Sequence, residues 1–361
     1  MIDLGNIKLL YVALAILVAF LISFAATPVV IGIAKKIKAI DVPKDNRRIH
    51  KKPIPLIGGL AIFYGFLISV LCFCVIDEAV IGIVLGALLI VITGIIDDKY
   101  SLPAKVKLLM QIVAAVIVIA FGVEMKYFEN PFTNEYVTLG WLSIPITIIW
   151  IVGVTNAVNL TDGLDGLAAG ISTIASLSLL ILILFTDNIN LAIMTAALAG
   201  GAFGFLPYNF NPAKIFMGDT GSMFLGYILA CISVQGLMKT YTVISFALPI
   251  LVLGLPIFDT LFAIVRRVVT GRSIMSPDRG HLHHRLLDMG FSQRQTVAIL
   301  YTLTAILCLT ALVIFLKDAL RGAVLVVAVV VIIIVSFAVL DSKTEKAKKP
   351  EEETPEGIKE S

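Results

Sequence analysis

The stretch AVIGIVLGALLIVITGIIDD, residues 79–98, is apolar over almost all of its length and ends in two adjacent aspartates. A helix needs about 20 apolar residues to cross a lipid bilayer, so residues 79–96 predict a transmembrane helix. Uninterrupted apolar runs recur along the chain, whereas a membrane β-barrel would alternate apolar and polar residues in segments of about ten. The predicted fold class is therefore an all-α, polytopic integral membrane protein.

The composition excludes other protein classes. Of the 361 residues, 59% are hydrophobic and only 15% are charged, against roughly 25% charged in soluble domains. A soluble fold could not bury this much apolar surface, and a disordered chain would have far less of it. The four cysteines all lie inside apolar runs, so we interpret them as small lipid- or core-facing residues rather than as disulfide partners or metal ligands.

The apolar runs predict eleven transmembrane helices. They cover residues 8–34, 55–76, 79–96, 106–122, 141–158, 167–186, 189–207, 221–238, 243–265, 296–316 and 319–341. Residues 1–341 are therefore interpreted as a single membrane domain. Residues 342–361 are charged and have no apolar periodicity, which predicts a disordered cytoplasmic tail. The loop over residues 123–140 is expected to hold a small hairpin.

The Lys and Arg residues are concentrated on alternate loops. If the loop at residues 35–54 faces the cytoplasm, the same face collects 23 of the 28 Lys and Arg residues. Cytoplasmic loops of membrane proteins carry this excess of positive charge. We therefore expect an external N-terminus, a cytoplasmic C-terminus and a location in the plasma membrane.

Acidic, amide and histidine side chains gather on the predicted cytoplasmic face. The segment GIIDD, residues 94–98, ends a span with two carboxylates, and such a pair is costly at a membrane boundary unless it binds cations or titrates. The alternative is a solvated helix end. Lys107 and Gln111 follow at helical spacing, and a lone lysine at the start of a span is a weak signal.

The densest polar motif is TNAVNLTDGLDG, residues 155–166. Asn156, Asn159, Asp162 and Asp165 are spaced by three residues, so successive members are neighbours if the segment is helical. Gly163 and Gly166 would let a ligand approach the backbone closely. This pattern favours recognition of a polar ligand, or of Mg²⁺ through oxygen atoms, over a polar turn.

Two further motifs carry polar clusters. In NFNPAKIFMGDTGS, residues 209–222, Asp219 is flanked by glycines that suit a diphosphate or a metal, although it could instead be a helix N-cap. In PDRGHLHHR, residues 277–285, three histidines lie among arginines, which favours phosphate binding over zinc or a solvated basic loop. Asp259 is interpreted equally as a structural hydrogen-bonding partner or as a member of the site.

The combination of carboxylates, histidines, basic groups and glycines at one membrane face is typical of a Mg²⁺-bound diphosphate site. The membrane setting implies a lipid substrate, so we predict phosphoryl transfer between a soluble nucleotide and a lipid carrier. An ion-coupled transporter is the distant alternative, because transporters place ionisable groups near the bilayer midplane and this chain has almost none there.

Five segments resemble a known family, the polyprenyl-phosphate N-acetylhexosamine-1-phosphate transferases of glycosyltransferase family 4. The chain is similar to the WecA/TagO group and is related to the MraY translocase. The segments, in order, are DVPKDNRRIHKKPIPLIGG (41–59), GIIDDKYSLPAKVKLLMQ (94–111), TNAVNLTDGLDGLAAG (155–170), NFNPAKIFMGDTGSMFLG (209–226) and PDRGHLHHRLL (277–287).

The resemblance implies a reaction. N-acetylglucosamine-1-phosphate would pass from UDP-N-acetylglucosamine to undecaprenyl phosphate, leaving UMP, with Mg²⁺ as cofactor and Mn²⁺ as a substitute. It implies that Asp97 orients or deprotonates the lipid phosphate, that Asp219 binds Mg²⁺, and that attack is direct. The product would enter a cell-envelope glycan such as teichoic acid or a surface polysaccharide. A homodimer is compatible with the family, and no nucleic acid partner is expected.

The family motifs also assign roles residue by residue. Catalytic roles are predicted for Asp97, Asp98, Asp162, Asp165 and His281, substrate binding for Lys107, Asn156, Asn159, Asn209, Arg279, His283 and His284, and metal binding for Asp98 and Asp219. One departure concerns the sugar, because Leu282 interrupts the three consecutive histidines of the MraY group. This pattern is similar to that of the subgroup using UDP-N-acetylglucosamine, and it argues against the alternative muramoyl-pentapeptide substrate. Another UDP-N-acetylhexosamine stays open as an alternative.

Overall fold

The computed structural model describes residues 4–43, 52–129, 136–236, 243–271, 273 and 280–316, and these residues are mainly helical. The helices of the first half are α1 (Leu4–Ile37), α2 (Gly59–Phe73), α3 (Glu78–Tyr100), α4 (Ala104–Ala120) and α5 (Ser143–Thr161). Those of the second half are α6 (Leu167–Leu184), α7 (Ile189–Asn209), α8 (Gly218–Gly236), α9 (Val243–Val252), α10 (Gly254–Val269), α11 (Leu282–Asp288) and α12 (Gln293–Phe315). Two short antiparallel strand pairs, β1 (Ile40–Asp41) with β2 (Ile54–Pro55) and β3 (Tyr127–Glu129) with β4 (Tyr136–Thr138), complete these elements.

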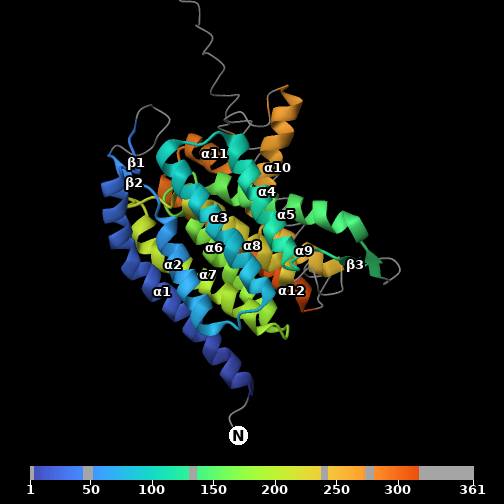
Figure 1. Cartoon of the computed structure of the whole chain (residues 1–361). Helices are drawn as coiled ribbons and strands as arrows, with labels where there is room; N and C mark the ends of the chain where they lie inside the picture. The colour runs from blue at the N-terminus through green and yellow to red at the C-terminus, as the bar shows by residue number, and fades with distance from the viewer. Residues whose placement is uncertain are drawn as a thin grey trace, which may run out of the picture.

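Helix α8 lies at the centre of the bundle, packed against α2, α3, α5, α6 and α7 (Figure 1). Every residue of α8 from Thr220 to Val234 is buried. Small residues make this close packing fit, since a Cβ at Gly226 would lie only 2.7 Å from the Cα of Thr155 on α5. The N-terminus of α8, with its polar residues, is therefore held by protein on several sides.

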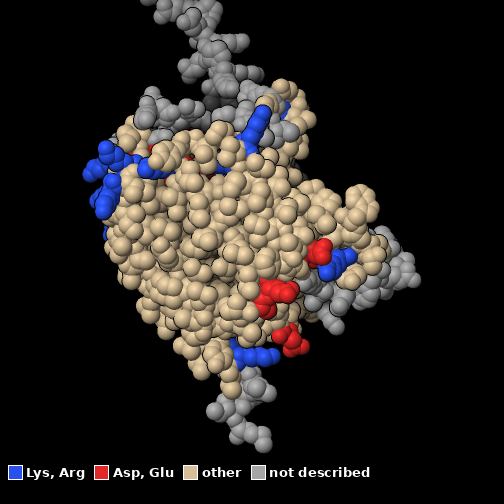
Figure 2. Space-filling view, viewed as in Figure 1, with Lys and Arg blue, Asp and Glu red and all other residues tan. Residues whose placement is uncertain are grey.

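Several helices are long and apolar enough for a bilayer. Within the described residues, α1, α3, α6, α7 and α12, together with residues 140–161 that contain α5, are long and apolar enough to span a membrane. Helix α2 is a shorter apolar helix. Figure 2 shows a broad middle zone of the visible face without charged side chains, and Lys and Arg gather at one end of it. The prediction of an all-α membrane protein is therefore confirmed. Predicted span 319–341 and the tail lie outside the described residues.

The ninth predicted span, residues 243–265, differs from the expectation because it forms two helices. Helix α9 ends at Val252 and α10 begins at Gly254. Pro256 has no backbone N–H, so it cannot donate to the carbonyl of Val252 four residues earlier. The thiol of Cys308 on α12 instead lies 3.9 Å from that carbonyl oxygen. Beyond the break, α10 leans away from the bundle (Figure 1).

The two strand pairs lie in loops. The pairing of β3 with β4 confirms the hairpin expected within residues 123–140. Strand β2 does more, because its chain continues along the segment that precedes α8. Phe216 N donates to Pro55 O, Gly58 N donates to Phe216 O and Gly59 N donates to Met217 O, and each N–O distance is 2.9 Å. This backbone ladder holds the segment that carries Asp219.

Candidate active site

The C-terminal end of α3 meets the N-terminal end of α8. The contact is close because Gly94 has no side chain: a Cβ there would lie 2.4 Å from the Cα of Thr220. One turn later, Asp98 accepts hydrogen bonds from the backbone N–H groups of Asp219 (2.8 Å) and Thr220 (3.1 Å) and from the Thr220 hydroxyl (2.6 Å). Asp98 therefore satisfies two of the free N–H groups at the start of α8, where the helix dipole also stabilises a negative charge.

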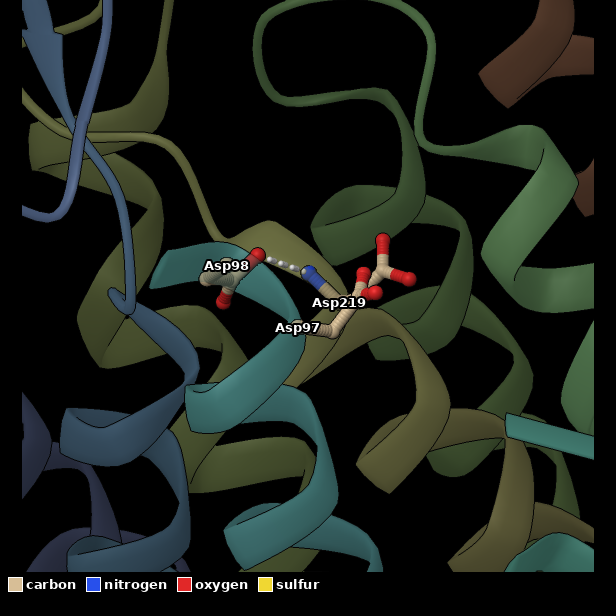
Figure 3. Close-up of side chains that lie close together, drawn as sticks. All are labelled: Asp97, Asp98 and Asp219. Atoms are coloured by element: carbon tan, nitrogen blue, oxygen red, sulfur yellow. Dashed lines mark hydrogen bonds between the residues drawn. The ribbon is translucent and has the colours of Figure 1, made fainter. Parts of the chain in front are cut away.

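Asp219 projects from α8 toward a second aspartate of α3, Asp97 (Figure 3). Lys107 of α4 lies between them, with Nζ 3.2 Å from Asp97 Oδ2 and 2.7 Å from Asp219 Oδ2. The other oxygen of Asp219 accepts from Asn159 Nδ2 at 3.1 Å, and the same nitrogen contacts Ser222 Oγ at 2.8 Å. Four helices therefore contribute polar side chains to one cluster.

The three aspartates fit a divalent metal. Asp97, Asp98 and Asp219 each offer an oxygen, and these oxygens lie within 4.8 Å of one another. Carboxylate oxygens are the ligands that Mg²⁺ prefers, and the ion commonly binds proteins through one or two carboxylates together with substrate phosphates. The donor set therefore suits Mg²⁺, with room in the coordination sphere for a phosphate ligand.

A cavity of about 780 Å³ opens beside this cluster. Its lining includes seven residues predicted for the site from the sequence: Asp98, Asn159, Asp162, Asp165, Asn209, Asp219 and His284. Lys52, Lys214, Asn211 and Gln293 also line it. Carboxylates, amides, ammonium groups and an imidazole therefore share one cavity, which suits a polar ligand.

The loop between α5 and α6 forms one wall of the cavity. If the whole motif were helical, Asp162 and Asp165 would continue the face of α5 that carries Asn159. Helix α5 ends at Thr161, however, so both aspartates lie in the loop. Burial, and after it the negative charges of Asp219, Asp98 and Asp165, together raise the pKa of Asp162 to about 8. Near pH 7 the protonated form of Asp162 is therefore favoured.

The end of α7 and the segment that follows it hold this loop in place. Asp165 Oδ2 accepts from Asn211 Nδ2 and from Ala213 N, both at 3.0 Å. Asn209 Oδ1 accepts from Gly166 N at 3.0 Å, while its own Nδ2 donates to Ile215 O. The buried Asn209 therefore ties the loop to the end of α7.

Helix α12 supplies two residues that the sequence motifs did not indicate. Gln293 Oε1 accepts from Asn211 Nδ2 at 2.7 Å, and the Tyr301 hydroxyl donates to Gly166 O at 2.5 Å. The tyrosine sits directly over Gly170, where a Cβ would lie 1.9 Å from its hydroxyl oxygen. In the sequence, only Gly170 hints at this contact, and the hint cannot be recognised without knowing that Tyr301, 131 positions later, packs on it.

The histidine motif lies next to the same loop. Asp259 accepts from the backbone N–H of Leu282 and contacts His281 Nδ1, both at 2.9 Å. It is therefore a structural partner of the histidine motif and also a neighbour of one of its histidine rings. His283 is buried against Gly163, where an added Cβ would lie 2.3 Å from its Nε2. Burial, and after it the neighbouring His284, lower the pKa of His283 to about 3, so this ring is neutral near pH 7.

The remaining predicted residues occupy different places. Asn156 lies one turn before Asn159 and exchanges hydrogen bonds with Gln111 of α4, at 2.6 and 3.4 Å. Asn156, Asp97, Lys107, His281 and His283 are not among the residues that line the cavity. Arg279 lies outside the described residues.

Comparison with known proteins finds a family match over the segment that contains most of the site. Residues 80–237 match the model of glycosyl transferase family 4. This segment runs from α3 to α8 and so includes the three aspartates, Lys107 and the loop between α5 and α6. The histidine motif and α12 lie beyond it.

Curated relatives cover most of the chain. A Bacillus subtilis protein named probable undecaprenyl-phosphate N-acetylglucosaminyl 1-phosphate transferase is 44% identical, over 85% of this chain and 86% of its own. A decaprenyl-phosphate N-acetylglucosaminephosphotransferase of Mycolicibacterium smegmatis is 35% identical over 92% and 89%, and a phospho-N-acetylmuramoyl-pentapeptide-transferase of Caldicellulosiruptor bescii is 33% identical over 83% and 96%. With its acidic cluster at the end of a membrane helix bundle, this chain belongs to glycosyl transferase family 4.

Proposed function

We propose that this protein transfers N-acetylglucosamine-1-phosphate from UDP-N-acetylglucosamine to undecaprenyl phosphate, giving the lipid-linked diphosphate sugar and UMP. The observation that carries the proposal is the convergence of Asp97, Asp98 and Asp219 beside a polar cavity at the end of apolar helices. Such a place is accessible to a soluble nucleotide and to a lipid headgroup at once. The names of the relatives support the same reaction.

In this mechanism, an oxygen of the lipid phosphate attacks the β-phosphorus of the nucleotide sugar. A new O–P bond forms, the bond between the β-phosphorus and the bridging oxygen breaks, and UMP leaves. Asp98 and Asp219, with Asp97 nearby, would hold Mg²⁺, which neutralises charge on the diphosphate when it is bound. Asp97 orients the attacking phosphate or takes its proton.

The cavity residues bind and orient the nucleotide sugar. Asn159 and Asp162 lie at the end of α5 beside the metal cluster, where the uridine half is expected from the family motifs. His284 faces the cavity, and neutral His283 supports the loop behind it while retaining one N–H donor. The basic side chains Lys52 and Lys214 add positive charge for an anionic substrate.

The distribution of charge supports the proposed orientation of the protein in the membrane. Lys and Arg gather at one end of the visible face in Figure 2. The positive-inside rule supports a cytoplasmic location of this end, and with it an active site on the cytoplasmic face of the plasma membrane. The muramoyl-pentapeptide substrate is the second candidate, supported by the 33% identical relative, but Leu282 interrupts the histidine run expected for it.

The test is the nucleotide released by the purified protein. The full chain in detergent, with Mg²⁺, undecaprenyl phosphate and UDP-N-acetylglucosamine, should release UMP, and chelation with EDTA should stop the release. Release of UDP would instead indicate simple glycosyl transfer and would contradict the proposal. UMP from UDP-N-acetylgalactosamine or from the muramoyl-pentapeptide nucleotide, but not from UDP-N-acetylglucosamine, would correct the sugar alone.

Tyr301 gives a test of how the cavity wall is positioned. Tyr301→Phe keeps the ring over Gly170 but removes the hydroxyl that donates to Gly166 O. One hydrogen bond contributes about 1 kcal/mol, and 1.4 kcal/mol corresponds to tenfold, so we expect KM for the nucleotide sugar to rise about fivefold with little change in kcat. Steady-state kinetics measure both values.

The control for this substitution is Tyr64→Phe on α2, because the Tyr64 side chain is exposed. It should leave both constants at their original values. A fall in kcat with unchanged KM in the Tyr301 variant would mean that the hydroxyl acts on the chemical step rather than on the substrate-binding loop.

A further inference from the structure

Lys107 stands where a cation is expected between two of the three aspartates. Its Nζ is 2.7 Å from Asp219 Oδ2 and 3.2 Å from Asp97 Oδ2, and the side chains of the three residues are only 25%, 26% and 11% exposed, respectively. The same two aspartates belong to the group that could hold a metal. One lysine therefore neutralises part of the charge of the proposed metal site from within the protein.

The ammonium group and a divalent metal exclude one another at this place. Two positive ions a few ångströms apart repel strongly in a partly buried site, where water screens them poorly. Each also needs the Asp219 oxygen as a partner. A metal that binds this oxygen of Asp219, with Asp98 as its second carboxylate ligand, must therefore displace the lysine side chain.

The local backbone lets the side chain move alone. Lys107 lies at the start of α4, and the turn before it is fixed because Leu102 N donates to Asp97 Oδ1 at 2.7 Å. The lysine side chain has a flexible four-carbon stem, so its charge can swing without any shift of the helix. Asp219 keeps its hydrogen bond from Asn159, and Asp98 keeps its hydrogen bond from the α8 backbone.

From this geometry we infer that Lys107 is an internal counter-ion that occupies the metal position in the metal-free protein and yields it when metal and nucleotide enter together. The inference rests on the proposed function for the identity of the anionic substrate. Metal alone must displace Lys107 without offering it a new partner, so it binds weakly. A nucleotide diphosphate supplies that partner, so the displaced ammonium contacts phosphate oxygens.

This exchange couples the two ligands. A nucleotide that stabilises the displaced lysine raises the affinity for metal, and linkage requires the metal to raise the affinity for nucleotide by the same factor. The metal-binding form is a minor state of the free protein, and the apparent affinity is reduced by the fraction of that state. Removing the lysine charge should abolish this penalty.

The experiment measures Mn²⁺ binding to the full chain in detergent by the electron paramagnetic resonance signal of free Mn²⁺. Without nucleotide, Lys107→Met should bind Mn²⁺ at least about tenfold more tightly than the original protein, which corresponds to 1.4 kcal/mol. Lys105→Met is the matched control, because Lys105 is an exposed lysine two residues earlier on the same helix. It should leave the affinity unchanged.

The direction of the effect separates this role from others. A lysine that only supports the fold, or that helps to shape the metal site, would weaken Mn²⁺ binding when it is replaced. Unchanged or weaker binding by Lys107→Met would therefore overturn the inference. Lys107→Arg retains the charge and should bind no more tightly than the original protein.

A second measurement uses UDP as a non-reacting nucleotide. UDP should raise the Mn²⁺ affinity of the original protein by a larger factor than that of Lys107→Met. If neither Lys107→Met nor Lys107→Gln folds, the original protein decides alone, and a Mn²⁺ affinity that UDP leaves unchanged overturns the exchange. These titrations need no turnover, so a protein that fails to release UMP can still display the exchange.

Discussion

Asp219→Asn is expected to reduce the release of UMP by at least about 1,000-fold while the protein stays folded. Asparagine has nearly the shape of aspartate and keeps an oxygen that can accept from Asn159. It loses the negative charge that holds Lys107 in the free protein and the metal in the proposed complex. Losing one group that stabilises transition-state charge commonly costs 10²–10³ in rate, and a lost metal ligand adds to this.

The measurements for this variant are the initial rate of UMP release over a series of Mg²⁺ concentrations and the thermal unfolding temperature in detergent. Asp187→Asn is a suitable control, because Asp187 is exposed and forms an ion pair with Lys8 away from the cluster. Activity within tenfold of the original value in the Asp219 variant would remove this residue from the metal site.

The second large effect is expected from a single methyl group, in Gly94→Ala. The added Cβ would lie 2.4 Å from Thr220 Cα and 2.5 Å from Thr220 N, and both are backbone atoms that cannot rotate away. Helices α3 and α8 must therefore separate, which breaks the contacts of Asp98 with the start of α8 and moves Asp97 away from Asp219. A misplacement of about 1 Å at a catalytic centre can cost 100-fold in rate, which is the loss that we expect.

Stability should fall as well, by about 1–3 kcal/mol, because the substitution overpacks a buried contact. The control is Gly153→Ala on α5, since a Cβ there would meet nothing within 4 Å. Alanine is the better helix former, so this control should be neutral or slightly stabilising. Equal activity of the two variants, measured as UMP release, would show that the contact of α3 with α8 does not position the aspartates.

Much of the bundle was predictable because the length of an apolar run is set by the thickness of the bilayer. The predicted spans 79–96 and 189–207 lie within α3 and α7 almost end to end. The break between α9 and α10 was not anticipated, although Pro256 lies in the run. A proline tolerated within a membrane helix and a proline that ends one look alike in sequence, and here the thiol of Cys308 on another helix contacts the carbonyl left without its usual partner.

For the site, the sequence predicted which residues take part better than it predicted which residues contact one another. The motifs indicated that Asp97, Asp98 and Asp219 belong to one centre, and these aspartates do converge. They did not indicate that Asp98 binds the start of α8 or that Tyr301 holds the loop after α5, because both contacts join residues more than 100 positions apart. Such contacts depend on how helices pack, which no local spacing records.

The enclosure of α8 has a consequence for the surroundings of the enzyme. Since protein buries every residue from Thr220 to Val234, the surrounding helices shield this stretch of α8, which begins next to Asp219, from acyl chains. Cells alter the length and saturation of their lipids with temperature, and such changes act on the tilt of helices exposed to the bilayer. Asp219 is therefore shielded from changes in lipid composition, whereas Asp97 and Asp98 lie on α3, a candidate membrane span with only half of its apolar window buried in the protein.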